Sequence, residues 1–366
     1  MAAHSSIING ESFDTIIIGA GQAGLATGHY LAARDRGFVI LDGASRIGDS
    51  WRERWDSLRL FTTAAHDGLP GMPFPPPAQH LPDKDEVADY LEEYAQRFNL
   101  PLRLNAHVDL LTWNGERYIV HVGERRLAAL NTVVATGSFQ RPRTPAVAAR
   151  LSPQLYQLHS SQYRNPSALP AGPVLVVGAG NSGVQIALEL ARSRHVWLAG
   201  RTRSHIPRRL LGRDVFDWLW PLMARIPLDS LVGRVLRTRM RRGDLLVGNP
   251  ASEMAREGIV RVGRLTEERG GLPVCGGVVI EPRVVLWCTG FESGYRWIKL
   301  PVLDGAGAPR HHGGVALDSP GLYFMGLRFQ RRLTSSLLGG VGEDAKFITE
   351  RISQERGLRQ VSARPH

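Results

Sequence analysis

Two glycine-rich hexapeptides are the residues of this chain whose types and spacing most clearly indicate chemistry. They read Gly19-Ala20-Gly21-Gln22-Ala23-Gly24 and Gly178-Ala179-Gly180-Asn181-Ser182-Gly183. In a G-x-G-x-x-G turn, the first glycine makes the turn, the second lets a pyrophosphate approach the backbone, and the third lets helix and strand pack closely. The positive end of the helix dipole favours the bound anion. Two such turns predict an enzyme that holds two dinucleotides and passes electrons between them.

Each hexapeptide stands where this function requires it, between a strand and a helix. The runs 15–18 and 174–177 are rich in β-branched residues and precede the two turns. Residues 14–42 therefore predict a strand, a glycine turn, a helix and a second strand. The second unit repeats the plan, with a helix over 184–192 and a strand over 195–199. Each unit is a βαβ motif of the dinucleotide-binding kind.

The remaining elements extend both units. Helical spacing predicts helices over 83–98 and 339–351, and apolar runs predict strands over 108–111, 118–122, 132–135, 284–287 and 322–325. The fold class is therefore α/β, with two Rossmann-like dinucleotide-binding domains, the second inserted into the first. Residues 1–165 and 290–366 are expected to form the first domain, which is discontinuous. Residues 166–289 are expected to form the second, with a helical excursion over about 214–242.

The residue at the end of each second strand distinguishes the two dinucleotides. Asp42 follows the first glycine turn by about 20 residues, the usual distance of an acid that binds ribose hydroxyls, which suits FAD. The second unit has no acid there but carries Arg201 and Arg203. A carboxylate would repel a 2′-phosphate, whereas arginine pairs with it. We therefore predict NADPH rather than NADH at the second site, with solvated surface arginines as the alternative interpretation.

Composition limits the other possibilities. The net charge is +11 at a pI near 10.3, but all of the basic residues except Lys84, Lys299 and Lys346 are arginines scattered along the chain. Such scatter favours an arginine-rich composition over a nucleic-acid surface. The two cysteines, Cys275 and Cys288, form no CxxC pair and suggest no metal site. No signal peptide or long apolar span is visible, so a cytoplasmic location is expected.

Further motifs are similar to those of class B flavoprotein monooxygenases. These include the flavin-containing monooxygenases, the plant indole-pyruvate (YUCCA-type) enzymes and bacterial flavoproteins associated with potassium transport. The similarity rests on both glycine turns, the segments 46–51 and 69–75, and the Thr136-Gly137 and Thr289-Gly290 pairs. It departs from the family fingerprint at Pro153 and Leu155, while His159 and Tyr163 match it. The resemblance implies that NADPH reduces FAD, which activates O2 as a peroxyflavin that oxygenates a small organic substrate.

The resemblance also implies cofactor contacts at particular residues. Besides Asp42, Arg201 and Arg203, the expected contacts are Gly19, Gly21, Gly24, Arg46, Gly48, Ser50, Trp51, Thr136, Gly137, Gly178, Gly180, Asn181, Ser182, Gly183, Thr289, Gly290, Gly339 and Gly340. Trp51 is either an apolar wall of the flavin site or a core residue. Catalytic candidates are limited to Thr62, Thr63 and His159, each with a structural role as the alternative.

Two questions remain open at the level of sequence. The basic, apolar segment 214–242 either packs over the substrate and nicotinamide cleft or lies on an anionic membrane. The alternatives to a monooxygenase are an NADPH-linked flavoprotein reductase with a ferredoxin-type acceptor and a non-catalytic nucleotide-binding regulator of cation transport. The absence of CxxC argues against a disulfide reductase. Oxygen uptake with NADPH distinguishes these three functions.

Overall fold

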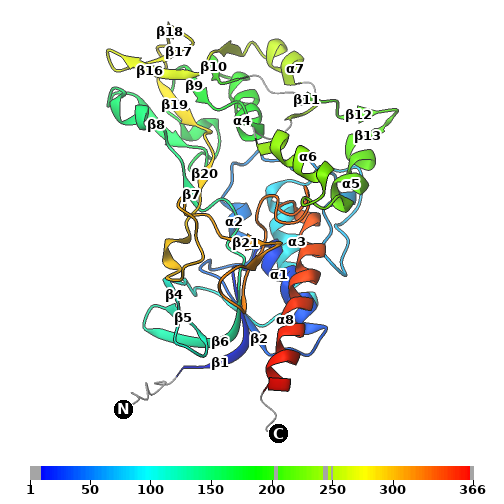
Figure 1. Ribbon diagram of the computed structural model, residues 1–366. Helices are drawn as coiled ribbons and strands as arrows, with labels where there is room; N and C mark the ends of the chain where they lie inside the picture. Colours follow the sequence, from blue (N-terminus) through cyan, green and yellow to red (C-terminus); the bar gives the residue numbers. More distant parts are fainter. Residues whose placement is uncertain (1–9, 202–204, 242–245, 249, 363–366) are drawn as a thin grey trace.

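Two lobes, each built on its own sheet, lie one above the other in the computed structural model (Figure 1). The structure describes residues 10–201, 205–241, 246–248 and 250–362. Within these residues the strands of the two predicted nucleotide units fall in different sheets. The chain therefore has the two-domain α/β architecture that the sequence predicts.

The lower lobe contains a sheet with a parallel centre. Its parallel strands, in spatial order, are β23 (Leu322–Phe324), β6 (Arg125–Val134), β1 (Ser12–Ile18), β2 (Phe38–Leu41) and β3 (Leu102–Arg103). The antiparallel strands β4 (Leu110–Trp113), β5 (Tyr118–Val122), β21 (His311–His312) and β22 (Val315–Ala316) extend it. β2 is buried along its whole length, as expected for a parallel strand that is covered on both faces.

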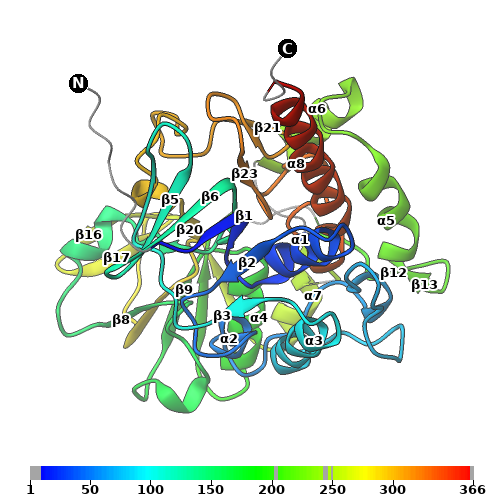
Figure 2. The ribbon, with the colours of Figure 1, turned by 90° about the horizontal axis from the view of Figure 1, so that it is seen from below.

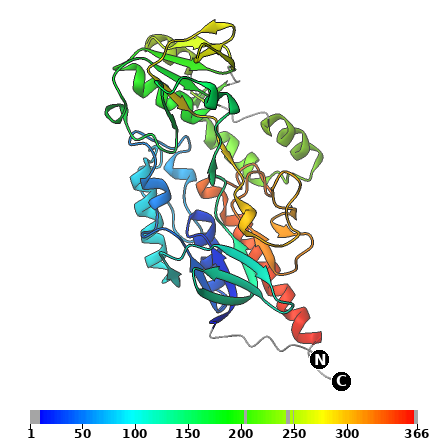
Figure 3. The same ribbon diagram turned by 90° about the vertical axis from the view of Figure 1, so that its left-hand side faces the viewer.

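Helices from both ends of the chain cover this sheet. They are α1 (Gln22–Ala32), α3 (Lys84–Arg97) and the long α8 (Gly342–Ser362), with the short α2 (Asp49–Arg52) beside α3. Figure 3 shows α8, in red, running along the lower lobe, and α8 packs against α1. α3 begins with a capping box, because the Asp83 carboxylate accepts from Glu86 N while the Glu86 carboxylate accepts from Asp83 N.

The upper lobe contains a fully parallel sheet. Its strands, in spatial order, are β15 (Val260–Val262), β10 (Val196–Ala199), β9 (Val174–Val177), β19 (Val284–Trp287) and β8 (Tyr156–His159). Helices α4 (Asn181–Ala191) and α7 (Pro250–Arg256) pack in this lobe, together with the antiparallel strands β16 (Leu265–Arg269), β17 (Leu272–Cys275) and β18 (Val278–Val279). The short 3₁₀ turns are η1 (Ala64–His66), η2 (Ala146–Arg150), η3 (Pro166–Ala168), η4 (Tyr295–Trp297) and η5 (Leu338–Gly340).

The chain crosses between the lobes twice, and the crossings pair with each other. Strand β7 (Arg141–Pro142) and strand β20 (Phe291–Glu292) are antiparallel. Strand β8 precedes residue 166 but belongs to the upper sheet, so the first crossing lies between β7 and β8 rather than near residue 165. The side chains of Trp51 and Leu60 pack against the cores of both lobes.

An excursion leaves the upper lobe after β10. It contains β11 (His205–Ile206), the hairpin of β12 (Arg209–Leu210) and β13 (Arg213–Asp214), and helices α5 (Val215–Arg225) and α6 (Leu231–Arg241), and it returns through β14 (Leu246–Val247). The predicted helical segment 214–242 is thus two helices. In Figures 1 and 2 the hairpin, α5 and α6 lie together at the right-hand side of the molecule.

Candidate dinucleotide-binding sites

The first glycine turn has the geometry that its sequence requires. Gly19 has φ +109°, and a Cβ there would lie 2.5 Å from the carbonyl oxygen of Ala135 at the end of β6. A Cβ on Gly24 would lie 1.9 Å from the carbonyl oxygen of Gly19. A Cβ on Gly21, by contrast, would have no heavy atom within 4 Å. Two glycines therefore allow close packing, and the middle glycine, the N-cap of α1, leaves open space.

The second glycine turn repeats this geometry. Gly178 has φ +115°, and its Cβ would lie 2.2 Å from the carbonyl oxygen of Cys288. A Cβ on Gly183 would lie 1.8 Å from the carbonyl oxygen of Gly178, whereas one on Gly180 would meet nothing within 4 Å. In both lobes the first glycine packs against the residue that precedes a Thr-Gly pair. Asn181 and Ser182 form the first turn of α4 after this N-cap.

The residues that were predicted to distinguish the dinucleotides lie beside these turns. The Asp42 carboxylate accepts hydrogen bonds from Ala20 N at 2.6 Å and from Ala44 N at 2.8 Å, which fixes it against the first turn. Gly200 packs close to Ala179 of the second turn, and the next residue, Arg201, is exposed. Arg203 lies outside the described residues. Gly200 thus occupies the position in the upper lobe that Asp42 occupies in the lower lobe, and Arg201 follows it by one residue.

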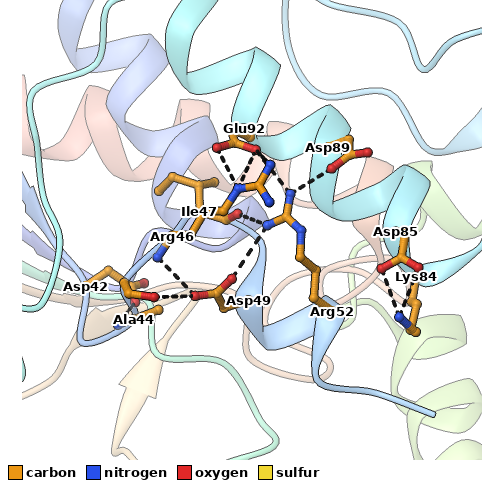
Figure 4. Close-up of polar contacts among 11 residues, drawn as sticks. Asp42, Ala44, Arg46, Ile47, Asp49, Arg52, Lys84, Asp85, Asp89 and Glu92 are labelled. Carbon is orange, nitrogen blue, oxygen red and sulfur yellow. Dashed lines mark hydrogen bonds and ion pairs between the residues drawn. The ribbon is translucent and has the colours of Figure 1, made fainter. Parts of the chain in front are cut away.

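The segment that follows β2 forms an ion-pair network with α3 (Figure 4). Arg46 forms a two-pronged pair with Glu92, at 2.9 Å and 2.6 Å, and Arg52 contacts Asp89 at 2.7 Å. A Cβ on Gly48 would come within 2.7 Å of Ala88, so this glycine permits the close approach of α2 to α3. The Arg46 side chain therefore joins the segment before α2 to α3.

Ser50 is exposed, whereas Trp51 is half-buried and packs against the cores of both lobes. Residues 51–60 reach the second lobe, where Gln185 of α4 donates to Arg59 O at 3.1 Å and Asn165 donates to the Asp56 carboxylate at 2.7 Å. This segment therefore joins the two nucleotide units next to Trp51.

The two Thr-Gly pairs lie at the interlobe crossings and are tied together by side chains. The Gln140 amide donates to Thr136 Oγ1 at 2.9 Å and accepts from Gly294 N at 2.7 Å. Thr289 Oγ1 donates to Arg143 O, and Arg143 N donates to Gly290 O at 2.9 Å. The first crossing is thereby fixed to the second. Gly137, with φ +72°, lines a cavity of about 280 Å³ with Tyr295 and Arg328.

His159 contacts the second interlobe crossing. Its Nε2 lies 3.0 Å from Gly290 O, which only accepts, so Nε2 carries the proton and Nδ1 accepts from Ser161 N at 3.1 Å. Burial is the largest cause that lowers the pKa of His159, and Arg54 acts in the same direction. Both ring nitrogens are therefore engaged in hydrogen bonds, an arrangement suited to positioning the interlobe crossings.

Thr62 and Thr63 lie in a buried polar cluster that includes a residue which the sequence did not suggest. Thr62 Oγ1 donates to Asp67 Oδ1 at 2.6 Å, and all three side chains are buried. Within the described residues, Asp67 Oδ2 and Thr63 Oγ1 have no hydrogen-bond partner. Burial raises the pKa of Asp67 to about 7, although the Thr62 hydrogen bond and Arg208 act in the opposite direction. The cluster therefore contains a carboxyl that binds a proton near neutral pH.

This cluster joins the excursion to the Gly339-Gly340 loop. A Cβ on Gly339 would lie 2.0 Å from His66 O, and one on Gly340 would lie 1.9 Å from Thr334 O. From the excursion, Arg208 donates to Phe61 O at 2.5 Å, and Asp217 contacts His66 Nε2 at 3.0 Å. The loop over 61–68 is thus held from two sides.

The final helix begins later than expected. Gly339 and Gly340 form η5, and α8 starts at Gly342 rather than Gly339, because the close contacts of both glycines hold this stretch in a tight turn. Asp344 lies in the first turn of α8, 1% exposed and 3.7 Å from Arg331. Burial raises the pKa of Asp344 to about 6.

Comparison with known proteins decides the family. A family model described as pyridine nucleotide-disulphide oxidoreductase matches residues 16–221, more than half of the chain. The chain belongs to this family. Among its relatives in this oxidoreductase family is an uncharacterized CzcO-like oxidoreductase of Geobacillus kaustophilus, which is 42% identical over 93% of this chain and 98% of the relative.

Two monooxygenases resemble the chain over most of its length. The indole-3-pyruvate monooxygenase YUCCA4 of Oryza sativa subsp. japonica is 29% identical, over 93% of this chain and 87% of the relative. A solved structure of a variant flavin monooxygenase from Stenotrophomonas maltophilia matches with a TM-score of 0.79 and 26% identity, over 94% of this chain and 99% of that chain. These matches confirm the predicted class B flavoprotein monooxygenase group, the fold class and a flavin-dependent oxidoreductase. They agree with FAD and a nicotinamide dinucleotide as cofactors.

Several residues of the site were not foreseen. Asp67 and the excursion residues Arg208 and Asp217 act through contacts between segments far apart in the chain. Gln140 stands four residues after Thr136, and this spacing in the sequence does not indicate the hydrogen bond between the two side chains. Among the described residues, no group of three or more His, Cys, Asp or Glu is arranged to hold a metal ion, and no helix is long and apolar enough to cross a membrane.

Proposed function

We propose that this protein is an NADPH-dependent, FAD-containing monooxygenase that oxygenates a small organic substrate. One observation carries the proposal: two glycine turns share the same geometry, with close packing at the outer glycines and open space over the middle one, Gly21 or Gly180. That space, at the N-terminus of α1 or α4, suits a pyrophosphate. The proposal thus places one such site in each lobe.

The residues beside each glycine turn indicate which dinucleotide each lobe would bind. In the lower lobe, Asp42 would accept hydrogen bonds from the ribose of FAD, with Thr136 and Gly137 nearby at the end of β6. In the upper lobe, Arg201 would pair with the 2′-phosphate of NADPH, beside Thr289 and Gly290 at the end of β19. A carboxylate at that position would repel the phosphate, and none follows β10 before residue 202.

The chain's own residues would bind and orient the cofactors. FAD supplies the redox chemistry when it is bound, accepting electrons from NADPH and delivering them to O2. Trp51, packed on both cores, would exclude water between the lobes, and the Gln140 and His159 contacts would hold the crossings in register. The Thr62-Thr63-Asp67 cluster would offer hydrogen bonds, including a proton held by the Asp67 carboxyl.

An oxygen electrode tests this proposal. FAD-loaded protein is mixed with NADPH and isotopically labelled O2, with indole-3-pyruvate as an α-keto acid probe and methyl phenyl sulfide as a thioether probe. A monooxygenase consumes O2 with NADPH and places labelled oxygen in a product. NADPH consumption that needs an added electron acceptor would instead indicate a reductase, and no consumption at all would indicate the non-catalytic regulator.

A further inference from the structure

Exposed apolar side chains concentrate on the excursion. Half of the large apolar side chains that are exposed in the described part of the chain lie between residues 210 and 235. We call these seven the excursion surface: Leu210, Leu211, Trp218, Leu222, Leu231, Val232 and Val235. Single exposed apolar residues are ordinary, but a concentration of them on neighbouring elements is typical of an interaction site.

Each helix of the excursion presents an apolar face outward. On α5, Trp218 and Leu222 are exposed one turn apart, whereas Phe216 is buried and Trp220 stacks on His66. On α6, Leu231 and Val235 are exposed one turn apart, while Gly233 on the other side packs against Pro227 O, 2.1 Å from where its Cβ would be. The inward faces are thus already used within the protein, and the outward faces have no cover in the described residues.

The hairpin tip adds an apolar residue in an unfavourable conformation. Leu211 lies between β12 and β13 with φ +51°, a region that L-residues other than Asn and Asp rarely occupy. Its side chain is 84% exposed. A leucine in a left-handed turn at a protruding tip costs free energy both in its backbone and in its hydration, which is typical of a functional contact.

Arginines surround this apolar surface. Arg209 and Arg213 flank the hairpin tip, Arg225 ends α5, and Arg234 and Arg237 lie on α6. Among the acids nearby, Asp214 pairs with Arg208 at 2.7 Å and Asp217 contacts His66, whereas Asp229, between the two helices, is exposed. The surface is therefore both apolar and strongly basic.

We propose that the excursion surface binds the surface of an anionic membrane. Arginines above apolar side chains match the phosphates and the acyl boundary of a lipid leaflet, and two eleven-residue helices suit an interfacial position rather than a span. A second copy of the chain is the less suitable partner, because a two-fold interface would place these arginines opposite one another. The proposal does not depend on the reaction that the protein catalyses.

Vesicle sedimentation tests the proposal with the full-length, FAD-loaded protein. Vesicles of phosphatidylcholine alone are compared with vesicles that contain equal parts of phosphatidylglycerol. We expect binding to the phosphatidylglycerol vesicles that weakens with salt. The Leu211→Ser/Val235→Ser variant should bind at least about tenfold more weakly because its apolar contacts are lost. The Arg209→Gln/Arg234→Gln variant should bind about 25-fold more weakly, at about fivefold per arginine.

Control variants separate this surface from general effects. Leu317→Ser and Val278→Ser remove exposed apolar side chains elsewhere and should bind as the wild type does. A polarity-sensitive dye on Leu211→Cys should shift to the blue on phosphatidylglycerol vesicles, whereas the same dye on Leu317→Cys should not. Circular dichroism melting confirms that each variant is folded.

Three outcomes would overturn the proposal. They are no vesicle binding by the wild type, equal binding to both lipid compositions, and unchanged binding by the excursion variants. Sedimentation equilibrium provides the remaining comparison. If the wild type self-associates, does not bind vesicles, and becomes monomeric in the Leu211→Ser/Val235→Ser variant, the surface belongs to an interface between two copies.

Discussion

Replacing Asp67 with asparagine should remove a pH dependence of stability that this carboxyl creates. Burial raises the pKa of Asp67 from 3.8 to about 7, while its side chain is fully buried. An asparagine at this position would keep the acceptor for Thr62 Oγ1 and, like the protonated acid, carry no charge. The substitution therefore imitates the low-pH form at every pH.

The sign and size of this pH dependence of the free energy of unfolding follow from proton linkage. Between about pH 4 and pH 7 the folded protein binds a proton at Asp67 that the unfolded chain has released, so the free energy of unfolding falls as pH rises. The shift of about three pKa units corresponds to a loss of about 4 kcal/mol, complete above the folded pKa. About 2 kcal/mol of that loss in the free energy of unfolding takes place above about pH 5.5.

Urea unfolding at about pH 5.5 and about pH 8.5 measures this effect. The difference in free energy of unfolding between Asp67→Asn and the wild type should move by about 2 kcal/mol in favour of the variant from the lower to the higher pH. Asp318→Asn, which removes a half-exposed carboxylate paired with Arg310, is the matched control and should show no such gain. An equal stability difference between Asp67→Asn and the wild type at both pH values would refute the reasoning.

Three further predictions concern the dinucleotide sites. Gly180→Ala should fold with wild-type stability, because its Cβ meets nothing, but should bind NADPH at least about tenfold more weakly in a fluorescence titration, since the methyl occupies the space of the pyrophosphate. Gly183→Ala should lose at least about 2 kcal/mol in urea unfolding, because its Cβ would lie 1.8 Å from Gly178 O; wild-type stability would contradict this packing argument. Arg201→Ala should raise the KM for NADPH about 10- to 100-fold and leave the KM for NADH unchanged. The control Arg192→Ala, at another exposed arginine, should change neither KM. An equal rise in KM for both cofactors would exclude a 2′-phosphate contact.

Local patterns in the sequence predicted the parts of the fold that local physics determines. The glycine turns, the capped helix after Asp83 and the buried β-branched strands each depend on a few neighbouring residues, and each forms as expected. Boundaries were less accurate. β6 begins at Arg125 rather than Thr132 because β5 pairs with residues 125–129, and a pairing partner cannot be recognised from apolar runs alone.

Contacts between distant segments could not be predicted in this way. The contribution of β8 to the upper sheet depends on its pairing with β19, more than a hundred residues later. Asp67 resembles any loop carboxylate in the sequence, and only the packing of the excursion and the Gly339 loop around 61–68 makes it buried. The outward direction of the apolar face of α6 likewise depends on which side of the helix Pro227 contacts.

Anaerobic mixing of FAD-loaded protein with NADPH tests the central claim most directly, namely that the two lobes hold a flavin and a reduced nicotinamide close enough for electron transfer. The account predicts that the visible absorption of bound FAD is bleached on mixing, faster with NADPH than with NADH, and returns when O2 is admitted. Protein that takes up no FAD on reconstitution, or whose bound FAD stays oxidised with excess NADPH, would contradict it.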